Sequence, residues 1–458
     1  MKIHFLLFFF LSSFAAFAQQ KKPNLIFILT DDQRWDALGY AGNNIIQTQE
    51  MDRLASEGVY FRNAFVTTPI CAASRASILT GLYERTHGYT FGQTLQENFA
   101  NKSYPELLRN AGYKTAFFGK FGIKYPAFEE LFEIGDNYDR DTKFPDRRGY
   151  FYKTINGDSV HLTKYTSHQA QEFIKNQSAD QPFSLSLSFS APHAHDPAKD
   201  QYFWSAEVDD LYQGVTFPDP LLKEEKYFLD QPDYVRTGEN RNRWYWRFDT
   251  SEKYQKSMAG YYRMISEVDR EIGRIRKVLE EKELADNTVI IVMGDNGYFQ
   301  GERQLAGKWL MYDNSVRVPL IIYDPRAKNH RDISDFALNI DIAPTLLDFA
   351  GVKPPKTCQG ESLANYVSGK NPAAGREEFI VEHLWKVDII AASEGIRTTK
   401  WKYFRYVDDP AHEELYDLES DPLEMTNLAS DPSYKAELLK LRKKMEQKTA
   451  GYIKYAVD

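Results

Sequence analysis

A cysteine at the start of a predicted helix is the clearest reactive group in the sequence. The residues after Cys71 include several alanines, which favour a helix, and Gly81 is suited to end it. The unpaired N–H groups and positive dipole end of such a helix suit a bound oxyanion. Arg75, one turn after Cys71, is expected on the same face. The alternative is a buried or disulfide-bonded cysteine, because free cysteines are among the most buried residues.

Carboxylates at the ends of two predicted strands indicate a cation site. The side chains are Asp31, Asp32, Asp295 and Asn296, which follow the apolar runs 24–30 and 288–293. Continuous apolar runs are typical of buried parallel strands, and ligand sites of open α/β sheets gather where such strands end. An all-oxygen ligand set suits Ca²⁺ or Mg²⁺ and disfavours Zn²⁺, which prefers His or Cys. The alternative is a pair of adjacent carboxylates in a solvated loop.

Two further polar groups follow predicted buried strands. Lys120 comes after the run 115–118 and is flanked by glycines, which allow an anion to approach closely. The run 183–189 is followed by Pro192 and His193. These positions predict that a lysine and a histidine join the carboxylates at one edge of a sheet.

The motif around Cys71 resembles the Cys-x-(Pro/Ala)-x-Arg signature of the type I sulfatases. Cys71, Ala73 and Arg75 carry it, and Leu79–Gly81 continues the family pattern. In that family a maturase oxidises the cysteine to formylglycine, whose hydrated aldehyde is the nucleophile. Several separate motifs, in family order, extend the resemblance over nearly the whole mature chain. The fold implied is that of the alkaline phosphatase superfamily: α/β, with a large mixed β-sheet sandwiched by helices and a small C-terminal antiparallel sheet-plus-helix subdomain.

The resemblance also implies roles for individual residues. One Ca²⁺ would be held by Asp31, Asp32, Asp295, Asn296 and the modified Cys71. Lys120, Lys308 and Arg75 would stabilise the charge of the transition state. Asp295 would activate the attacking hydroxyl, and His193 would protonate the leaving alcohol.

One position departs from the family pattern. Most members have a histidine two residues after the lysine, whereas this chain has Gly122. The group that removes the proton when the aldehyde is regenerated therefore stays open. The branch related to N-acetylglucosamine-6-sulfatases has a similar loss, and the following Lys124 and Tyr125 are also similar to that branch.

Substrate contacts are expected from a few more side chains. His87 and His195 lie close to the motifs, although isolated histidines are more often incidental. Residues 196–250 are read as irregular and rich in Pro, Asp and aromatic residues, which favours a cap over the site. Trp246 in this segment is a candidate platform for sugar rings. The alternative is that these aromatic residues only pack.

Other elements position these groups. Apolar residues from Tyr254 to Leu279 recur at steps of three and four, which predicts a long scaffold helix. After residue 355, short alternating segments such as 401–404 and 414–417 predict a small antiparallel sheet, followed by a helix over 434–445. We therefore expect a catalytic domain over 19–355 and a subdomain over 356–458.

Composition limits the function classes. The chain has 458 residues, 42% of them hydrophobic, and a net charge of −8, which argues against nucleic acid as the main partner. Its two cysteines, Cys71 and Cys358, offer one disulfide, but the motif at Cys71 favours a free thiol.

The N-terminus predicts export. A basic start, an apolar run over 5–17 and the triplet Ala16–Ala18 are typical of a signal peptide over 1–18, cleaved near Ala18. No later segment approaches the ~20 apolar residues that a membrane span needs. We expect a periplasmic or secreted protein with no membrane span.

Together these observations predict an exported sulfuric ester hydrolase acting on sulfated polysaccharides or their oligosaccharides. We prefer algal polymers such as ulvan or carrageenan as substrates, because the aromatic-rich segment 196–250 would fit them. The alternatives are a glycosaminoglycan or mucin N-acetylglucosamine-6-sulfatase, a phosphodiesterase or phosphonate monoester hydrolase of the same superfamily, and a non-catalytic carbohydrate-binding relative.

Overall fold

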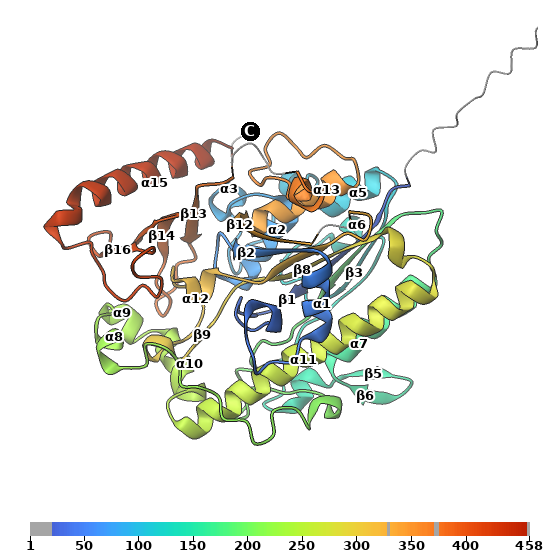
Figure 1. Ribbon diagram of the computed structural model, residues 1–458, viewed down its shortest axis with the longest axis horizontal. Coiled ribbons are helices and arrows are strands. Elements are labelled where there is room, and N and C mark those ends of the chain that lie inside the picture. Colours follow the sequence, from blue (N-terminus) through green and yellow to red (C-terminus); the bar gives the residue numbers. More distant parts are fainter. Residues whose placement is uncertain (1–20, 328–329, 371–374, 456–458) are drawn as a thin grey trace, which may run out of the picture.

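A mixed eight-stranded sheet forms the centre of the protein (Figure 1). The computed structural model describes residues 21–327, 330–370 and 375–455. In spatial order the strands are β12 (Arg331–Leu338), β2 (Val59–Phe65), β11 (Leu320–Tyr323), β8 (Thr288–Gly294), β1 (Asn24–Thr30), β7 (Phe183–Ser188), β3 (Lys114–Gly119) and β4 (Ile134–Asn137). The four apolar runs singled out in the sequence are β1, β3, β7 and β8, which are neighbours in this sheet.

Strand direction brings the ends of these four strands to one edge. β1 pairs in parallel with both β7 and β8, and β3 pairs in parallel with β7. β11 runs antiparallel to its neighbours β2 and β8. The residues that follow β1, β3, β7 and β8 therefore emerge together, as expected for a parallel core.

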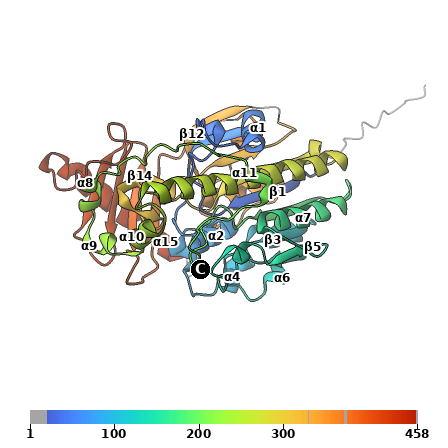
Figure 2. The same ribbon diagram turned by 90° about the horizontal axis from the view of Figure 1, so that it is seen from below.

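Helices cover both faces of the sheet. Along β1, Leu25, Phe27 and Leu29 belong to one apolar cluster, and Ile26 and Ile28 belong to another. This alternation is the two-residue period of a strand. Figure 1 shows α2 (Cys71–Thr80), α5 (Tyr104–Asn110) and α13 (Ile342–Phe349) on the first face, and α1 (Gln49–Glu57), α7 (Leu162–Lys175) and α11 (Ser251–Glu281) on the second. Seen from below, α11 runs beside α7 along the sheet (Figure 2).

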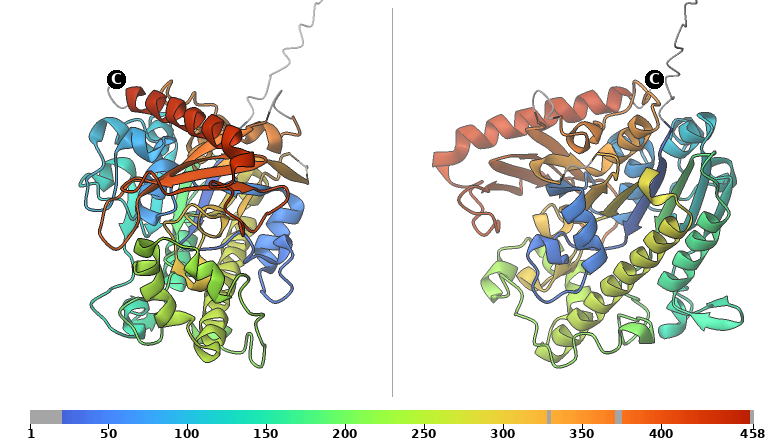
Figure 3. Two further views of the ribbon diagram at one scale, coloured as in Figure 1. Left: turned by 90° about the vertical axis from the view of Figure 1, so that its left-hand side faces the viewer. Right: turned by 45° about the vertical axis from the view of Figure 1, so that its right-hand side comes forward.

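The C-terminal part forms a second, smaller sheet. Its antiparallel strands are β13 (Glu378–His383), β14 (Ser393–Thr398), β15 (Trp401–Tyr406) and β16 (Glu413–Asp417). The long helix α15 (Lys435–Tyr455) lies across this sheet (Figure 3) and contributes Leu438, Leu441 and Met445 to the first apolar cluster. The predicted fold class, a large mixed sheet between helices with a small antiparallel sheet and helix, is confirmed.

Short elements complete the chain. The shorter helices are α3 (Glu84–His87), α4 (Glu97–Ala100), α6 (Phe128–Leu131), α8 (Glu225–Leu229), α9 (Asp233–Arg236), α10 (Glu239–Arg247), α12 (Asp313–Val316) and α14 (Ala364–Val367). Two small hairpins are formed by β5 (Lys153–Ile155) with β6 (Asp158–Val160) and by β9 (Phe299–Gln300) with β10 (Ala306–Gly307).

Two sequence predictions need correction. The segment 196–250 is not irregular throughout, because it contains α8, α9 and α10. The C-terminal helix continues about ten residues beyond the predicted end at 445, to Tyr455.

The proposed signal peptide lies outside the described residues. No helix within the described part of the chain is long and apolar enough to cross a membrane.

The end of β3 provides a test of how the sheet positions Lys120. Gly119 has a φ of +108°, and a Cβ there would overlap the carbonyl oxygen of Ser188 on β7. Gly112 also has a positive φ, +88°, but a Cβ there would meet nothing within 4 Å. We expect Gly112→Ala to lower the free energy of unfolding by about 1 kcal/mol, the cost of the left-handed backbone alone. Gly119→Ala should cost about 2 kcal/mol more, because β3 and β7 must separate. Equal losses of unfolding free energy in the two variants, measured by denaturant unfolding, would contradict the close contact of Gly119 with β7.

Candidate active site

The strand ends carry a cluster of buried carboxylates. Asp31 and Asp32 follow β1, and Asp295 and Asn296 follow β8. The Asp32 backbone N–H donates to Asp295 Oδ1 at 3.1 Å, and Asn296 Nδ2 donates to Asp32 Oδ1 at 2.6 Å. All four side chains are at most 1% exposed. The predicted association of the two strand ends is confirmed by these contacts.

Helix α2 brings Cys71 to this cluster. Cys71 is its first residue, and Gly81 ends it with a φ of +71°, as the sequence predicted. The Cys71 Sγ lies within a group of ligand atoms from Asp31 and Asp295 that are all within 4.8 Å of one another. Cys71 and Cys358 are both free, so the alternative disulfide does not form.

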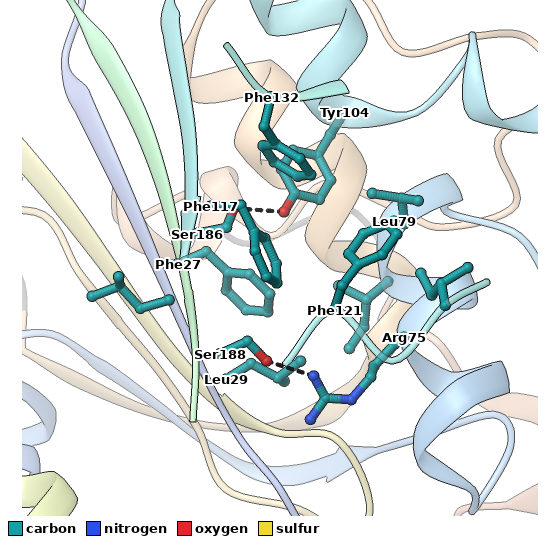
Figure 4. A pocket seen from close by; sticks show the side chains of 13 residues that line it. Phe27, Leu29, Arg75, Leu79, Tyr104, Phe117, Phe121, Phe132, Ser186 and Ser188 are labelled. Atoms are coloured by element: carbon teal, nitrogen blue, oxygen red, sulfur yellow. Dashed lines mark hydrogen bonds between the residues drawn. The ribbon is translucent and has the colours of Figure 1, made fainter. Parts of the chain in front are cut away.

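Arg75 links the helix to the carboxylates. Its Nε donates to Asp295 Oδ2 at 2.9 Å, and its Nη1 donates to the Lys120 carbonyl oxygen at 2.6 Å and to Ser188 Oγ. Figure 4 shows the guanidinium beside Ser188, at one end of a small apolar cavity lined by Phe27, Phe117 and other aromatic residues. Because Arg75 is only 3% exposed, its attraction to Asp295 is screened little by water.

Two lysines supply further positive charge. Lys120 pairs with Asp31 and lies 3.4 Å from Asp139. Lys308 pairs with Asp32 at 2.5 Å and lies 3.8 Å from Asp31. Although burial lowers the pKa of a lysine, the charges of Asp139 and Asp31 raise that of Lys120, and Asp32 raises that of Lys308. Both ammonium groups are therefore positively charged at neutral pH.

The carboxylates differ in acidity. Burial alone raises the pKa of Asp31, but the charges of Lys120, Lys308 and Arg75 outweigh it and bring the pKa below its ordinary value. Burial and the negative charge of Asp31 raise the pKa of Asp295 to about 6. Asp295 is thus a stronger base than an ordinary aspartate, which suits a group that accepts a proton near neutral pH.

His193 approaches the cluster from the segment after β7. Its Nε2 lies 3.5 Å from Asp32 Oδ2, while its Nδ1 accepts from Arg140 Nη1. Nδ1 also lies 2.6 Å from the Ala194 carbonyl oxygen, and Nε2 is the nitrogen that faces the carboxylates. Burial, followed by the charge of Arg140, holds the pKa of His193 well below its ordinary value. The imidazole is therefore neutral at neutral pH.

The residues at the strand ends fit a hard divalent cation. Asp31 Oδ1, Asp32 Oδ2 and Asn296 Oδ1 are buried and have no hydrogen-bond partner among the described residues. A buried acceptor without a partner costs about 1–3 kcal/mol, which a cation between these oxygens would offset. Carboxylate and amide oxygens are ligands that Ca²⁺ and Mg²⁺ prefer.

A cavity of about 430 Å³ opens above these groups. Cys71, Lys120, His193 and Lys308 line it. Its other lining residues include Phe91, Asp139, Arg140, Asp196, Glu239, Arg243, Trp309 and Trp385, which sequence reasoning did not select. Arg243 donates to Asp196 at 2.8 Å and to Glu239 at 3.1 Å, and its guanidinium lies 4.7 Å from the centre of the Trp309 ring. The cavity thus combines charged groups with aromatic surface.

Three predicted substrate residues lie away from this cavity. His87 ends α3, is buried, and contacts Ser77 Oγ at 3.0 Å and the Tyr89 backbone N–H at 3.0 Å. His195 is buried, and its Nε2 lies 2.6 Å from the Phe144 carbonyl oxygen. Trp246 is 43% exposed and lines a different cavity. We assign none of the three to the reacting groups.

Comparison with known proteins identifies the family. Residues 23–352 match the family model described as Sulfatase. The chain belongs to the sulfatase family. Residues 301–451 of this sulfatase also match the model of the C-terminal region of N-sulphoglucosamine sulphohydrolase. The predicted activity of a sulfuric ester hydrolase is therefore confirmed at the level of the enzyme class.

Individual relatives cover nearly the whole sulfatase. An N-acetylglucosamine-6-O-sulfatase of Bacteroides thetaiotaomicron is 30% identical over 95% of this chain and 87% of the relative. An ulvan-active sulfatase of Formosa agariphila is 28% identical over 94% of this chain and 81% of the relative. A solved structure in complex with its substrate D-glucosamine-2-N,6-O-disulfate has a TM-score of 0.79 at 27% identity and covers 94% of this chain and 98% of its own.

The fold is also shared with another enzyme class. The phosphonate monoester hydrolase of Agrobacterium radiobacter has a TM-score of 0.78 at 23% identity, covering 94% of this chain and 96% of its own. This likeness concerns the fold alone.

Gly122, which stands where the family pattern has a histidine, leaves space for the side chain of Arg75. Its φ is +70°, and a Cβ there would lie 2.8 Å from Arg75 Cδ. A side chain at this position must displace Arg75, which holds Asp295. The departure from the family pattern is therefore coupled to the position of the arginine.

We expect Gly122→Ala and Gly122→His both to lower kcat for sulfate release at least about tenfold, because a misplaced charged donor weakens transition-state stabilisation. The matched control is Gly88→Ala, at a glycine with a φ of +63° and nothing within 4 Å of its Cβ position. Initial rates and melting temperatures of the three variants make the comparison. A higher kcat in Gly122→His would contradict the coupling to Arg75.

Proposed function

We propose that this sulfatase is exported and removes sulfate from a sulfated glycan, using formylglycine made from Cys71 and one Ca²⁺. The observation that carries the proposal is the convergence of Cys71, Arg75 and two lysines on the buried carboxylates of one cavity. Such a cluster combines a nucleophile position with fixed positive charge for an oxyanion. The N-terminal sequence pattern supports export.

The modified residue and the metal supply the chemistry that ordinary side chains lack. Formylglycine supplies a hydroxyl nucleophile at position 71, and Ca²⁺ supplies Lewis-acid stabilisation of the sulfate oxygens. Asp31, Asp32 and Asn296 would hold the cation through the unpartnered oxygens described above, and Asp295 would complete the set with a carboxylate oxygen.

The chain's own side chains would divide the remaining work. Arg75 fixes Asp295 through its Nε, so that Asp295 can accept the proton of the attacking hydroxyl. Lys120 and Lys308 would bind sulfate oxygens as charged donors, since both line the cavity beside Cys71. His193 would direct its Nε2–H to the oxygen of the leaving alcohol. The negative charge of a bound sulfate would favour the protonated imidazole, which can then give a proton to the departing oxygen.

We propose a glucosamine unit carrying a 6-sulfate as the first substrate candidate. The N-acetylglucosamine-6-O-sulfatase relative and the glucosamine disulfate bound in the solved structure support it. The stretch from Gly122 to Tyr125 points in the same direction. Algal polysaccharide, which the sequence preferred, is the second candidate and is supported by the ulvan-active relative.

A substrate panel tests the proposal. Protein produced together with a formylglycine-forming maturase, with the aldehyde at position 71 verified by mass, is assayed for sulfate release. The substrates are N-acetylglucosamine 6-sulfate, heparin and ulvan oligosaccharides, carrageenan fragments and a phosphonate monoester. We expect release from the glucosamine 6-sulfates, and a fall to background in Cys71→Ala, which leaves the fold unchanged because the buried side chain is small.

Three other results of the substrate panel would change the proposed function. Release from ulvan or carrageenan fragments alone would reassign the substrate to algal glycans. Turnover by Cys71→Ala at the parent rate would contradict the assignment of the nucleophile. Hydrolysis of the phosphonate ester alone, with the aldehyde present, would contradict a sulfated substrate.

A further inference from the structure

A second cavity lies near the catalytic one, at the C-terminal end of α10. Its volume is about 400 Å³. Three elements form it: the segment 199–204, the end of α10 with Trp246, and the start of α11. None of the groups placed in the reaction lines it, so the mechanism leaves this cavity without a role.

The lining combines two indole rings. Trp204 is held in place, because its Nε1 donates to Asp209 Oδ1 at 2.6 Å and Arg263 lies 4.7 Å from its ring centre. Trp246 is 43% exposed. An exposed tryptophan beside a fixed one offers apolar surface of defined geometry for a flat ligand, together with polar edges.

Polar groups of the same cavity favour a hydroxyl-rich ligand. Lys199 and Glu252 are exposed and make no ion pair within the described part of the chain, whereas Lys253 pairs with Asp249 at 2.8 Å and Lys256 pairs with Asp200. Gln201 is 8% exposed, and its Oε1 has no hydrogen-bond partner among the described residues. The cavity therefore offers one ammonium and one carboxylate without ion pairs, and one unpaired acceptor.

Buried ion pairs join the two cavities. Asp196 lines the catalytic cavity and pairs with both Arg243 and Arg247 of α10. Lys199 follows Asp196 by three residues, and Trp246 follows Arg243 by three residues on the same helix. Lining residues of the two cavities are therefore close in the chain, so the cavities are neighbours and one extended ligand can contact both.

We propose that the second cavity is an accessory site that binds a sugar unit of the same sulfated glycan, away from the sulfate that is removed. The proposal rests on the glycan substrate proposed above. The tryptophans contact the sugar ring, Lys199 contacts a sulfate or carboxylate of the glycan, and Gln201 Oε1 accepts a hydrogen bond from a sugar hydroxyl. The site would raise affinity for oligosaccharides over single sugars by a second contact on one chain.

Binding is measured without turnover. Cys71→Ala protein is titrated with a heparin hexasaccharide and with ulvan oligosaccharides in a calorimeter. In this background Trp246→Ala is the main variant, because an exposed side chain can be removed without disturbing the fold. Lys199→Gln removes the anion contact alone. The matched control is Tyr245→Ala, which removes a 47% exposed aromatic ring from the same helix but does not line the cavity.

We expect Trp246→Ala to weaken binding of the better oligosaccharide about tenfold, the loss of one aromatic contact. Lys199→Gln should weaken it several-fold in low salt, and Tyr245→Ala should bind like the parent. In the active protein, Trp246→Ala should lower the ratio of kcat/KM for the oligosaccharide to kcat/KM for the sulfated monosaccharide.

Two results would overturn the accessory site: parent affinity in Trp246→Ala and Lys199→Gln, or equal losses in the Tyr245→Ala control. Absence of sulfate release in the panel, with Trp246-dependent binding retained, would contradict the proposed function but leave a sugar-binding cavity. The two failures are therefore distinguishable.

Discussion

Burial of three carboxylates at one edge of the sheet is the constraint on which the rest of the site depends. Asp31, Asp32 and Asp295 are at most 1% exposed, and charges removed from water are costly unless opposite charges lie close. Arg75, Lys120 and Lys308 supply those charges through direct contacts. Lys120 and Lys308 also line the cavity, so two of the groups that compensate the carboxylates can also receive an anion. A divalent cation would complete the balance, because three oxygens of the cluster have no hydrogen-bond partner in the described residues.

The fold meets this constraint through strand direction. Parallel pairing of β3, β7, β1 and β8 delivers the segments that carry Lys120, His193, Asp31 and Asp295 to one edge. Helix α2 then adds Cys71 from one face of the sheet, and the Trp309 backbone N–H donates to the Pro69 carbonyl oxygen at 2.9 Å. That hydrogen bond ties the loop of Lys308 to the turn before α2. Small changes at the glycines of this edge therefore affect the reacting groups directly.

Local patterns predicted the strands and α2 because each has a strong signal of its own. Apolar runs mark the buried strands, and alanines followed by a glycine mark α2. Arg140, Arg243 and Trp385 could not be predicted in the same way, since they come from segments without such a pattern. Arg140 follows β4, whose residues are mostly exposed, and Arg243 belongs to α10, in a segment read as irregular. His87 shows the opposite error: its place near the motifs suggested a substrate contact, but hydrogen bonds turn it into the protein interior.

Calcium binding is the direct test of the cation site at the ends of β1 and β8. Chelator-treated protein is titrated with Ca²⁺ in a calorimeter, and the variant Asp32→Asn is compared with Asp332→Asn, which alters a surface partner of Arg62 on β12. We expect one binding event per chain, retained in Asp332→Asn and weakened at least about tenfold in Asp32→Asn, which loses a charged ligand. No binding to the parent protein, or equal affinity in both variants, would contradict the cation site at the ends of β1 and β8.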